Sequence, residues 1–229
     1  MTVRKPKRLS PDELAPHLLH LPHADLTRRP AADQPPPLPL DWRQVFGNDR
    51  PVEIEIGSGK GLFLVTTATA RPERNFVGVE IVRKYALYMT DRVARRKLAN
   101  ARTSAADGKR VLSEYVPTGS VAAVHVYFPD PWWKTRHKKR LLFTPEFAAD
   151  VARVLAVGGV LHFASDVQDY FEMVTGTLAA VPDFRPLPPP ADNTPTHDMD
   201  YLTNFERKWR QMGRPIYRSR YERIESICS

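Results

Sequence analysis

The sequence has one cysteine, Cys228, in 229 residues, so no disulfide can form within the chain and no cysteine-rich metal site is expected. Its seven histidines show no paired metal-ligand spacing such as HExxH. No segment approaches about 18 consecutive apolar residues, and the basic start lacks the apolar stretch of a secretory signal. We therefore expect a protein of the reducing cytoplasm, with no metal and no membrane partner.

The charge of the chain is unevenly distributed. Its 34 basic and 26 acidic residues give a net charge of +8. Three blocks, at 83–97, 132–140 and 207–223, carry +5, +5 and +6, so the remainder carries −8. A directed positive surface of this kind favours a nucleic acid partner, with an anionic membrane, an acidic protein or simply solvated faces as the alternatives.

The first 50 residues differ in composition from the rest. Ten of the 22 prolines lie within residues 1–51, which is typical of an extended or partly disordered arm. At most short helices are expected near 11–20 and 41–46. We expect one folded domain over 51–229, because this length supports a single sizeable core.

From residue 51 onward, short apolar runs alternate with amphipathic ones. The pattern predicts strands at 52–56, 75–79, 101–106, 121–127 and 160–164. It predicts helices at 62–70, 82–98, 108–115, 144–155 and 166–180. A proline-rich loop, a helix near 200–212 and a β-like run at 216–224 follow. This alternation predicts a doubly wound α/β domain, with a parallel sheet and helices on both faces.

A glycine-rich segment, Gly57-Ser-Gly-Lys-Gly61, directly follows the first predicted strand. In a doubly wound sheet, ligands bind beyond the carboxyl ends of the strands, where glycine lets a ligand approach the backbone. A dinucleotide fingerprint would need glycine at position 62, which is Leu62, and the GxxxxGK[ST] phosphate loop is not matched either. The spacing fits S-adenosylmethionine better, with a glycine turn kept only for packing as the alternative.

Acidic residues occur at the ends of the first three predicted strands. Glu80 follows the second strand, where a carboxylate can accept both ribose hydroxyls of a nucleoside. Asp107 follows the third, where the adenine amino group would lie. Glu55 lies within the first strand, and because an unpaired buried carboxylate is costly, it indicates either a binding site or a buried ion pair. Together the three acids suit a cationic methyl donor.

The fourth predicted strand ends in Tyr127-Phe-Pro-Asp-Pro-Trp-Trp-Lys134. Two prolines restrict the backbone around Asp130, so its carboxylate points in a fixed direction. Five basic residues and His137 follow within 134–140, which would place phosphate attraction next to the chemistry. Trp132 and Trp133 either stack on a splayed base or pack under the loop.

Several motifs resemble those of the bacterial tRNA (guanine-N7)-methyltransferase family, in order, between about residues 52 and 223. They are Glu55-Ile-Gly-Ser-Gly-Lys-Gly61, Val79-Glu80, Phe128-Pro-Asp-Pro-Trp-Trp-Lys134 with Arg136-His-Lys-Lys-Arg140, Ala164-Ser-Asp166 and Thr203-Asn-Phe-Glu206. The resemblance implies a Rossmann-like class I methyltransferase fold. It also implies methyl transfer from S-adenosylmethionine to N7 of the guanosine at position 46, in the variable loop of tRNA.

The resemblance assigns roles to residues of this sequence and tRNA as the partner. The donor pocket would contain Glu55, Gly57, Gly59, Gly61, Glu80, Asp107 and Asp130, and Asp130 would also be the catalytic residue. The substrate nucleotide would contact Lys134, Asp166, Thr203, Asn204, Phe205 and Glu206. The RNA would contact Arg136, His137, Lys138, Lys139 and Arg140. The protein would be a monomer or a homodimer.

Two other functions stay open at this point. A methyltransferase acting on an exocyclic amine typically ends its fourth strand in Asp/Asn-Pro-Pro-aromatic, whereas Asp130-Pro131-Trp132 lacks the second proline. A non-catalytic RNA-binding protein on a methyltransferase scaffold would bind no donor.

Overall fold

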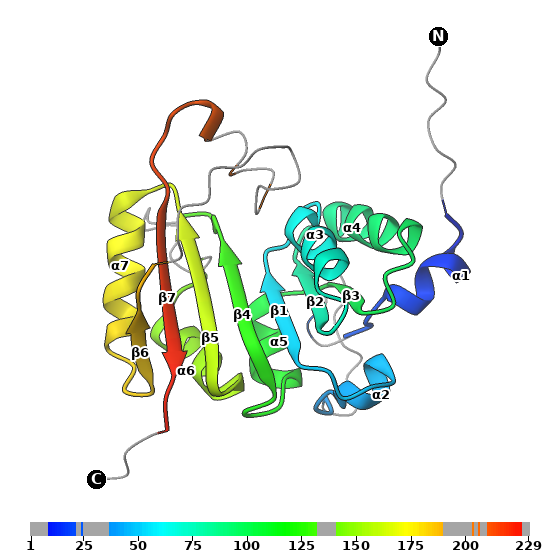
Figure 1. The fold of residues 1–229 in the computed structure, drawn as a ribbon, viewed down its shortest axis with the longest axis horizontal. Helices are drawn as coiled ribbons and strands as arrows, with labels where there is room; N and C mark the ends of the chain where they lie inside the picture. The colour runs from blue at the N-terminus through cyan, green and yellow to red at the C-terminus, as the bar shows by residue number, and fades with distance from the viewer. Residues whose placement is uncertain are drawn as a thin grey trace, which may run out of the picture.

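The computed structural model describes residues 9–21, 24, 37–131, 141–189, 203, 206 and 210–225. Its centre is a seven-stranded sheet in the order β3-β2-β1-β4-β5-β7-β6 (Figure 1). The strands are β1 (Val52–Ile56), β2 (Asn75–Glu80), β3 (Ala101–Ala105), β4 (Val121–Tyr127), β5 (Leu155–Ser165), β6 (Phe184–Leu187) and β7 (Tyr217–Arg223). The strand order reverses between β1 and β4, so a crevice for ligands is expected beyond their carboxyl ends.

The sheet is mixed, which corrects the expectation of a parallel sheet. β1 to β5 pair in parallel, but β7 pairs antiparallel with both β5 and β6. β7 is the predicted β-like run at 216–224, and it enters the sheet beside β5. β6 is not among the predicted strands, because it has only four residues and contains Pro186.

Helices cover both faces of the sheet, as predicted. α3 (Leu62–Ala70) and α4 (Arg83–Arg95) lie on one face over β1 to β3, and α5 (Gly108–Tyr115), α6 (Pro145–Val154) and α7 (Gln168–Ala179) lie on the other (Figure 1). Among the residues that the structure describes, no helix covers the α3 side of β4, β5 and β7. None of the described helices is long and apolar enough to span a membrane.

Side-chain alternation along β1 and β4 sorts apolar from polar residues. In β1, Ile54 and Ile56 join the main core under α5 and α6, so Glu53 and Glu55 point to the opposite face. In β4, Val124 and Val126 join the same core. The register pairs Glu55 with His125, so the polar side chains of both strands share the α3 face. β1 and β4 therefore place ionisable side chains in the interior of the domain.

The described stretches of residues 1–50 pack onto the domain, although the sequence analysis starts the domain at residue 51. Leu21, Ala24 and Phe46 are buried in the main core. The backbone N–H of Leu19 donates to Thr103 and that of Leu40 to Tyr115, each over 2.8 Å. The expected short helices are α1 (Pro11–Leu14), η1 (Ala15–His17) and α2 (Trp42–Phe46). Residues 1–8 and 25–36 of the expected arm lie outside the described residues.

Candidate active site

The glycine-rich loop leaves β1 in a left-handed backbone conformation. Gly57, Gly59 and Gly61 have φ angles of +80°, +53° and +70°, which favour glycine strongly. A Cβ at Gly61 would lie 2.5 Å from Cγ of Met89, so a larger residue would also clash there. A Cβ at Gly59 would meet no atom within 4 Å, so this part of the loop borders open space.

Glu80 holds this loop against the end of β2. Its two carboxylate oxygens accept hydrogen bonds from the backbone N–H groups of Gly59, over 2.7 Å, and Val82, over 2.8 Å. The Glu80 side chain is buried. Each carboxylate oxygen has a further lone pair, so the group can still accept ligand hydroxyls. The sequence predicted a carboxylate at this strand end but did not reveal that it also holds the loop.

A cavity of about 790 Å³ opens at this edge of the sheet, within the size range of small-molecule sites. Five of the predicted donor-pocket residues line it together: Gly57, Gly59, Glu80, Asp107 and Asp130. Ile81 and Val82 supply exposed apolar surface beside Glu80, which suits a flat purine ring. The side chain of Asp107 caps α5 by accepting from the N–H of Lys109 over 2.9 Å.

Glu55 lies deeper than the lining of this cavity and is almost fully buried. Its Oε2 has no hydrogen-bond partner among the described residues, so the buried ion pair considered for it is not seen there. Burial raises the pKa of Glu55 to about 8, against a hydrogen bond from Ser58, and the carboxylate of Glu80 adds to the rise. One unpartnered carboxyl oxygen next to a second acid fits a cationic donor such as S-adenosylmethionine.

The loop after β4 carries Asp130 to the same cavity. Phe128 has φ of +52°, an unusual value for a residue with a Cβ, and its N–H donates to Ala164 over 2.8 Å. Such a conformation costs roughly 1–3 kcal/mol and occurs most often at functional sites. Pro129 and Pro131 restrict the chain on either side of Asp130, whose side chain is exposed. The loop thus presents a carboxylate to the cavity from a constrained backbone.

Comparisons with known proteins show which family the chain belongs to. The family model described as "Putative methyltransferase" matches residues 49–219. A tRNA (guanine-N(7)-)-methyltransferase of Rhodopirellula baltica is 43% identical, over 90% of this chain and 82% of its own length. The chain belongs to the tRNA (guanine-N7)-methyltransferase family. A second family member, from Hydrogenovibrio crunogenus, is 37% identical over 81% of the chain and 77% of its own length.

Solved structures support the methyltransferase fold of the family. A 16S rRNA (adenine(1408)-N(1))-methyltransferase of Catenulisporales acidiphilia aligns with a TM-score of 0.55. The alignment covers 84% of this chain and 95% of that one at 17% identity, so it supports the fold alone. The predicted class I methyltransferase fold is confirmed.

Other residues that the family resemblance implies lie outside the described lining of the cavity. Gly61 packs against Met89 instead. Asp166 directly follows β5. The carboxyl ends of β4 and β5 are neighbours, because Tyr127 pairs with Ala164. Asp166 is not among the described residues that line the cavity. Ten further residues considered in the sequence lie outside the described residues: Trp132, Trp133, Lys134, Arg136, His137, Lys138, Lys139, Arg140, Asn204 and Phe205.

Thr203 and Glu206 form a cap in this family member. The hydroxyl oxygen of Thr203 accepts from the backbone N–H of Glu206 over 2.9 Å. The buried carboxylate of Glu206 accepts from Nε of Arg210 over 2.8 Å and also from Arg218 of β7. The bond between Thr203 and the backbone of Glu206 is of the kind that a helix N-cap residue makes.

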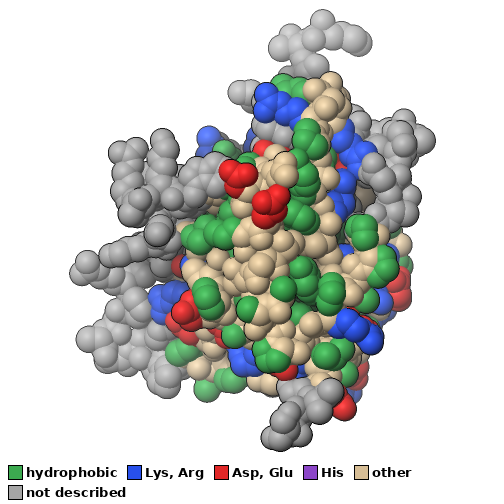
Figure 2. Space-filling view, turned by 90° about the vertical axis from the view of Figure 1, so that its left-hand side faces the viewer, with side chains coloured by type: hydrophobic (Ala, Val, Ile, Leu, Met, Phe, Trp, Pro, Cys, Tyr) green, Lys and Arg blue, Asp and Glu red, His purple; other side chains and the backbone are tan. Residues whose placement is uncertain are grey.

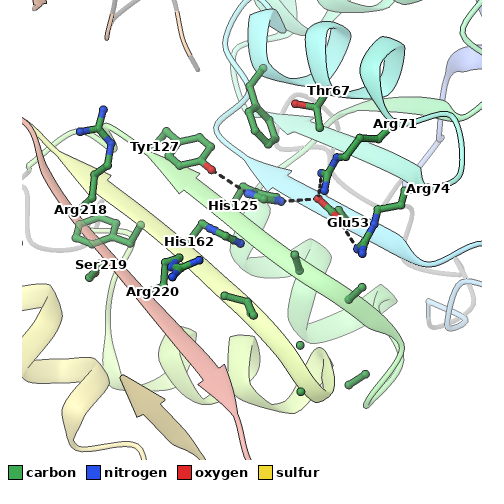
Figure 3. Close-up of a pocket in the computed structure, with 18 of the residues that line it drawn as sticks. Glu53, Thr67, Arg71, Arg74, His125, Tyr127, His162, Arg218, Ser219 and Arg220 are labelled. Carbon is green, nitrogen blue, oxygen red and sulfur yellow. Dashed lines mark hydrogen bonds and ion pairs between the residues drawn. The ribbon is translucent and has the colours of Figure 1, made fainter. Parts of the chain in front are cut away.

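Sequence reasoning missed a buried hydrogen-bonded chain on the α3 face. Oε2 of Glu53 lies 2.8 Å from Nε2 of His125, and Nδ1 of His125 lies 2.9 Å from the hydroxyl of Tyr127 (Figure 3). Arg71 and Arg74 bind the same carboxylate at 2.6 and 2.8 Å. The alternation of polar and apolar residues in β1 and β4 was the one sequence pattern that could have indicated these buried polar contacts.

The protonation states of this chain follow from burial and pairing. Burial opposes ionisation of Glu53, but the bonds from His125 and then Arg71 hold its pKa at about 2. Burial lowers the pKa of His125, against the effect of Glu53. An ionised Glu53 therefore accepts from Nε2–H of a neutral His125, and Tyr127 donates to Nδ1. Tyr127 also lines the cavity that contains Glu80 and Asp130, so these hydrogen bonds fix one wall of that cavity.

Proposed function

We propose that this protein transfers the methyl group of S-adenosylmethionine to N7 of the guanosine at position 46, in the variable loop of tRNA. The supporting observation is one cavity that combines Gly57, Gly59, Glu80, Asp107 and Asp130. Membership of the tRNA (guanine-N7)-methyltransferase family supports the same conclusion. We place the protein in the cytoplasm, as a monomer or a homodimer.

The cavity suits each part of the donor, which supplies an electrophilic methyl group on a positively charged sulfur. Glu80 would accept the ribose hydroxyls while it holds the loop, and Asp107 with its neighbouring backbone would meet the adenine amino group. Ile81 and Val82 would contact the adenine ring. Glu55, and the backbone of Gly57 and Gly59, would face the charged amino acid end.

N7 of guanine has an in-plane lone pair and no proton, so its methylation needs no general base. The protein must align the reacting atoms and tolerate positive charge as it develops on the purine. We assign this second task to Asp130, with Asp166 at the neighbouring strand end. The two carboxylates would accept from N1–H and the exocyclic amine of guanine, or stabilise the developing cation by charge alone.

The substrate side of the site extends beyond the donor cavity. Lys134, Asp166 and the Thr203–Glu206 element would contact the substrate nucleotide, and Arg136–Arg140 would bind phosphates. Each phosphate contact removed should reduce the slope of log affinity against log salt by about one. An unchanged slope in the Lys138→Ala, Lys139→Ala double variant would assign that run to solubility.

Donor titration and methyl transfer to defined tRNA test the proposal. We expect calorimetry to show binding of S-adenosylmethionine, and labelled donor to modify a tRNA transcript carrying guanosine at position 46. A transcript with adenosine at that position is the matched control and should stay unlabelled. Equal labelling of both transcripts would contradict the assigned position, and absence of donor binding would support a non-catalytic RNA-binding protein.

A further inference from the structure

A second cavity, of about 690 Å³, lies on the α3 face of the sheet, over β4, β5 and β7 (Figure 3). One wall is formed by α3 and the loop that follows it, and the other by β7. Among the described residues no helix covers this face, although helices cover the opposite face. We call this cavity the basic groove.

Arginines line both walls of the basic groove. Arg71 and Arg74 lie on the α3 side and Arg218 and Arg220 on the β7 side (Figure 3). Figure 2 shows several Lys and Arg side chains along its right-hand edge, which is the side that faces the viewer in Figure 1. The groove is therefore a basic surface that the three sequence blocks only partly indicated.

Two carboxylates and one backbone oxygen bind these arginines in the part of the chain that the structure describes. Arg71 and Arg74 share Glu53, Arg218 binds Glu206, and Arg220 donates to the backbone oxygen of Pro188. A guanidinium has five N–H donors, so one bond to a carboxylate leaves it able to bind another acceptor. The described residues that line the groove include four arginines and one acid, Glu53, so the lining is basic and complementary to a polyanion.

The floor of the basic groove is aromatic. The rings of His125 and His162 are stacked, with centroids 4.7 Å apart and planes 16° apart. Burial, and then the neighbouring His125, lower the pKa of His162 to about 3, so this ring is neutral near pH 7. His162 keeps part of its surface exposed. A flat ring between arginines is the arrangement that unstacked RNA bases bind, with the base on the ring and phosphates on the cations.

The basic groove lies next to the donor cavity. Tyr127 lines both, with Phe63 packed against its ring at 5.1 Å. A nucleic acid that occupies the groove would therefore lie close to the donor cavity.

We propose that the basic groove binds an unpaired segment of the substrate RNA, with a base stacked on His162 and backbone phosphates bound by Arg220 and Arg71. This interaction surface extends the proposed function and rests on it. It would hold the tRNA at a second place, away from the methylated guanosine.

Binding of tRNA to three variants tests the groove, measured by fluorescence anisotropy at several salt concentrations with S-adenosylhomocysteine present. We expect Arg220→Gln to weaken binding several-fold and to reduce the log–log salt slope by about one. We expect His162→Ala to weaken binding about tenfold, because it removes the stacking surface, and His162→Phe to retain wild-type affinity. Turnover at saturating tRNA should stay near wild type in all three.

The matched control is Arg43→Gln. It removes an exposed charge on α2, which precedes β1 in the sequence. It should change neither affinity nor slope. Arg71 and Arg74 are left intact because they hold the buried Glu53. Thermal unfolding confirms that each variant is folded.

The outcomes separate the groove from the proposed function. If Arg220→Gln and His162→Ala bind tRNA like Arg43→Gln while wild type methylates tRNA, the groove proposal fails and the function stands. If wild type binds donor and methylates no tRNA, the proposed function fails first. If the groove variants instead convert a dimer into a monomer in light scattering at unchanged tRNA affinity, the groove binds a second copy of the chain, which also overturns the proposal.

Discussion

Oε2 of Glu80 lies 2.7 Å from the backbone nitrogen of Gly59, so one carboxylate fixes the glycine-rich loop and borders the donor cavity. This contact joins two strand ends, β1 through the loop and β2 through Glu80. The loop and the acid therefore form one structural unit.

Replacement of Glu80 by glutamine should weaken donor binding by about 10- to 100-fold. An amide presents an NH2 group to one of the two N–H donors, and a hydrogen bond to a charged group contributes roughly 1.5–3 kcal/mol. Calorimetry with S-adenosylmethionine measures the change. Glu73→Gln, at an exposed position, should bind like wild type. A Glu80→Gln variant with unchanged affinity would rule out the ribose contact.

Asp130→Asn should lower kcat by about 100-fold or more while donor affinity changes by about twofold or less. The substitution keeps the shape of the side chain but removes the charge that favours the developing cation. Single-turnover methylation of intact tRNA gives the rate, and calorimetry gives the donor affinity. Asp49→Asn, on an exposed loop, is the control. A kcat near wild type would remove Asp130 from the chemistry.

Donor binding should release a proton near pH 7 through Glu55. The raised pKa of Glu55, about 8, keeps its carboxyl group largely protonated before binding, and an approaching cation favours the ionised form. Donor affinity should therefore rise with pH up to about 8 and then level off. Calorimetry in buffers of different ionisation enthalpy measures the released proton. Glu55→Gln should abolish it, and a wild-type enthalpy independent of the buffer would contradict this account.

Glu53→Gln should destabilise the fold without abolishing donor binding. Loss of one partner from a buried ion pair costs roughly 3 kcal/mol, and we expect the unfolding midpoint to fall by about 5–10 °C. The pKa of Glu53 is lowered to about 2 in the folded protein, so its contribution is complete above its ordinary pKa of 4.5 and is lost as the pH falls toward 2. The stability difference between wild type and variant should shrink over that range. A difference that does not depend on pH would show that Glu53 is not held as an ion.

Much of the site could be predicted because its residues follow strand ends in the sequence. Gly57, Gly59, Glu80, Asp107 and Asp130 each lie at, or within three residues after, the end of a strand of the parallel part, and strand order brings those ends together. Local pattern and the parallel-sheet rule were sufficient for this inference. The strained backbone at Phe128 was not visible in the residue pattern.

Features that depend on distant pairings were not predicted. His125 and Glu53 are 72 positions apart, and only the register of β1 against β4 brings them into contact. The pairing of β7 with β5 likewise joins segments that are far apart in the sequence. The packing of Leu21 and Phe46 into the core depends on three-dimensional contacts that a proline-rich composition does not reveal.

The identity of the methylated nucleoside tests the central claim most directly. Purified protein, labelled S-adenosylmethionine and bulk tRNA are incubated, and the tRNA is digested and mapped by mass spectrometry. We expect one labelled product, 7-methylguanosine, at position 46 of the variable loop. Label on an exocyclic amine, or no label in tRNA from a protein that binds the donor, would contradict it.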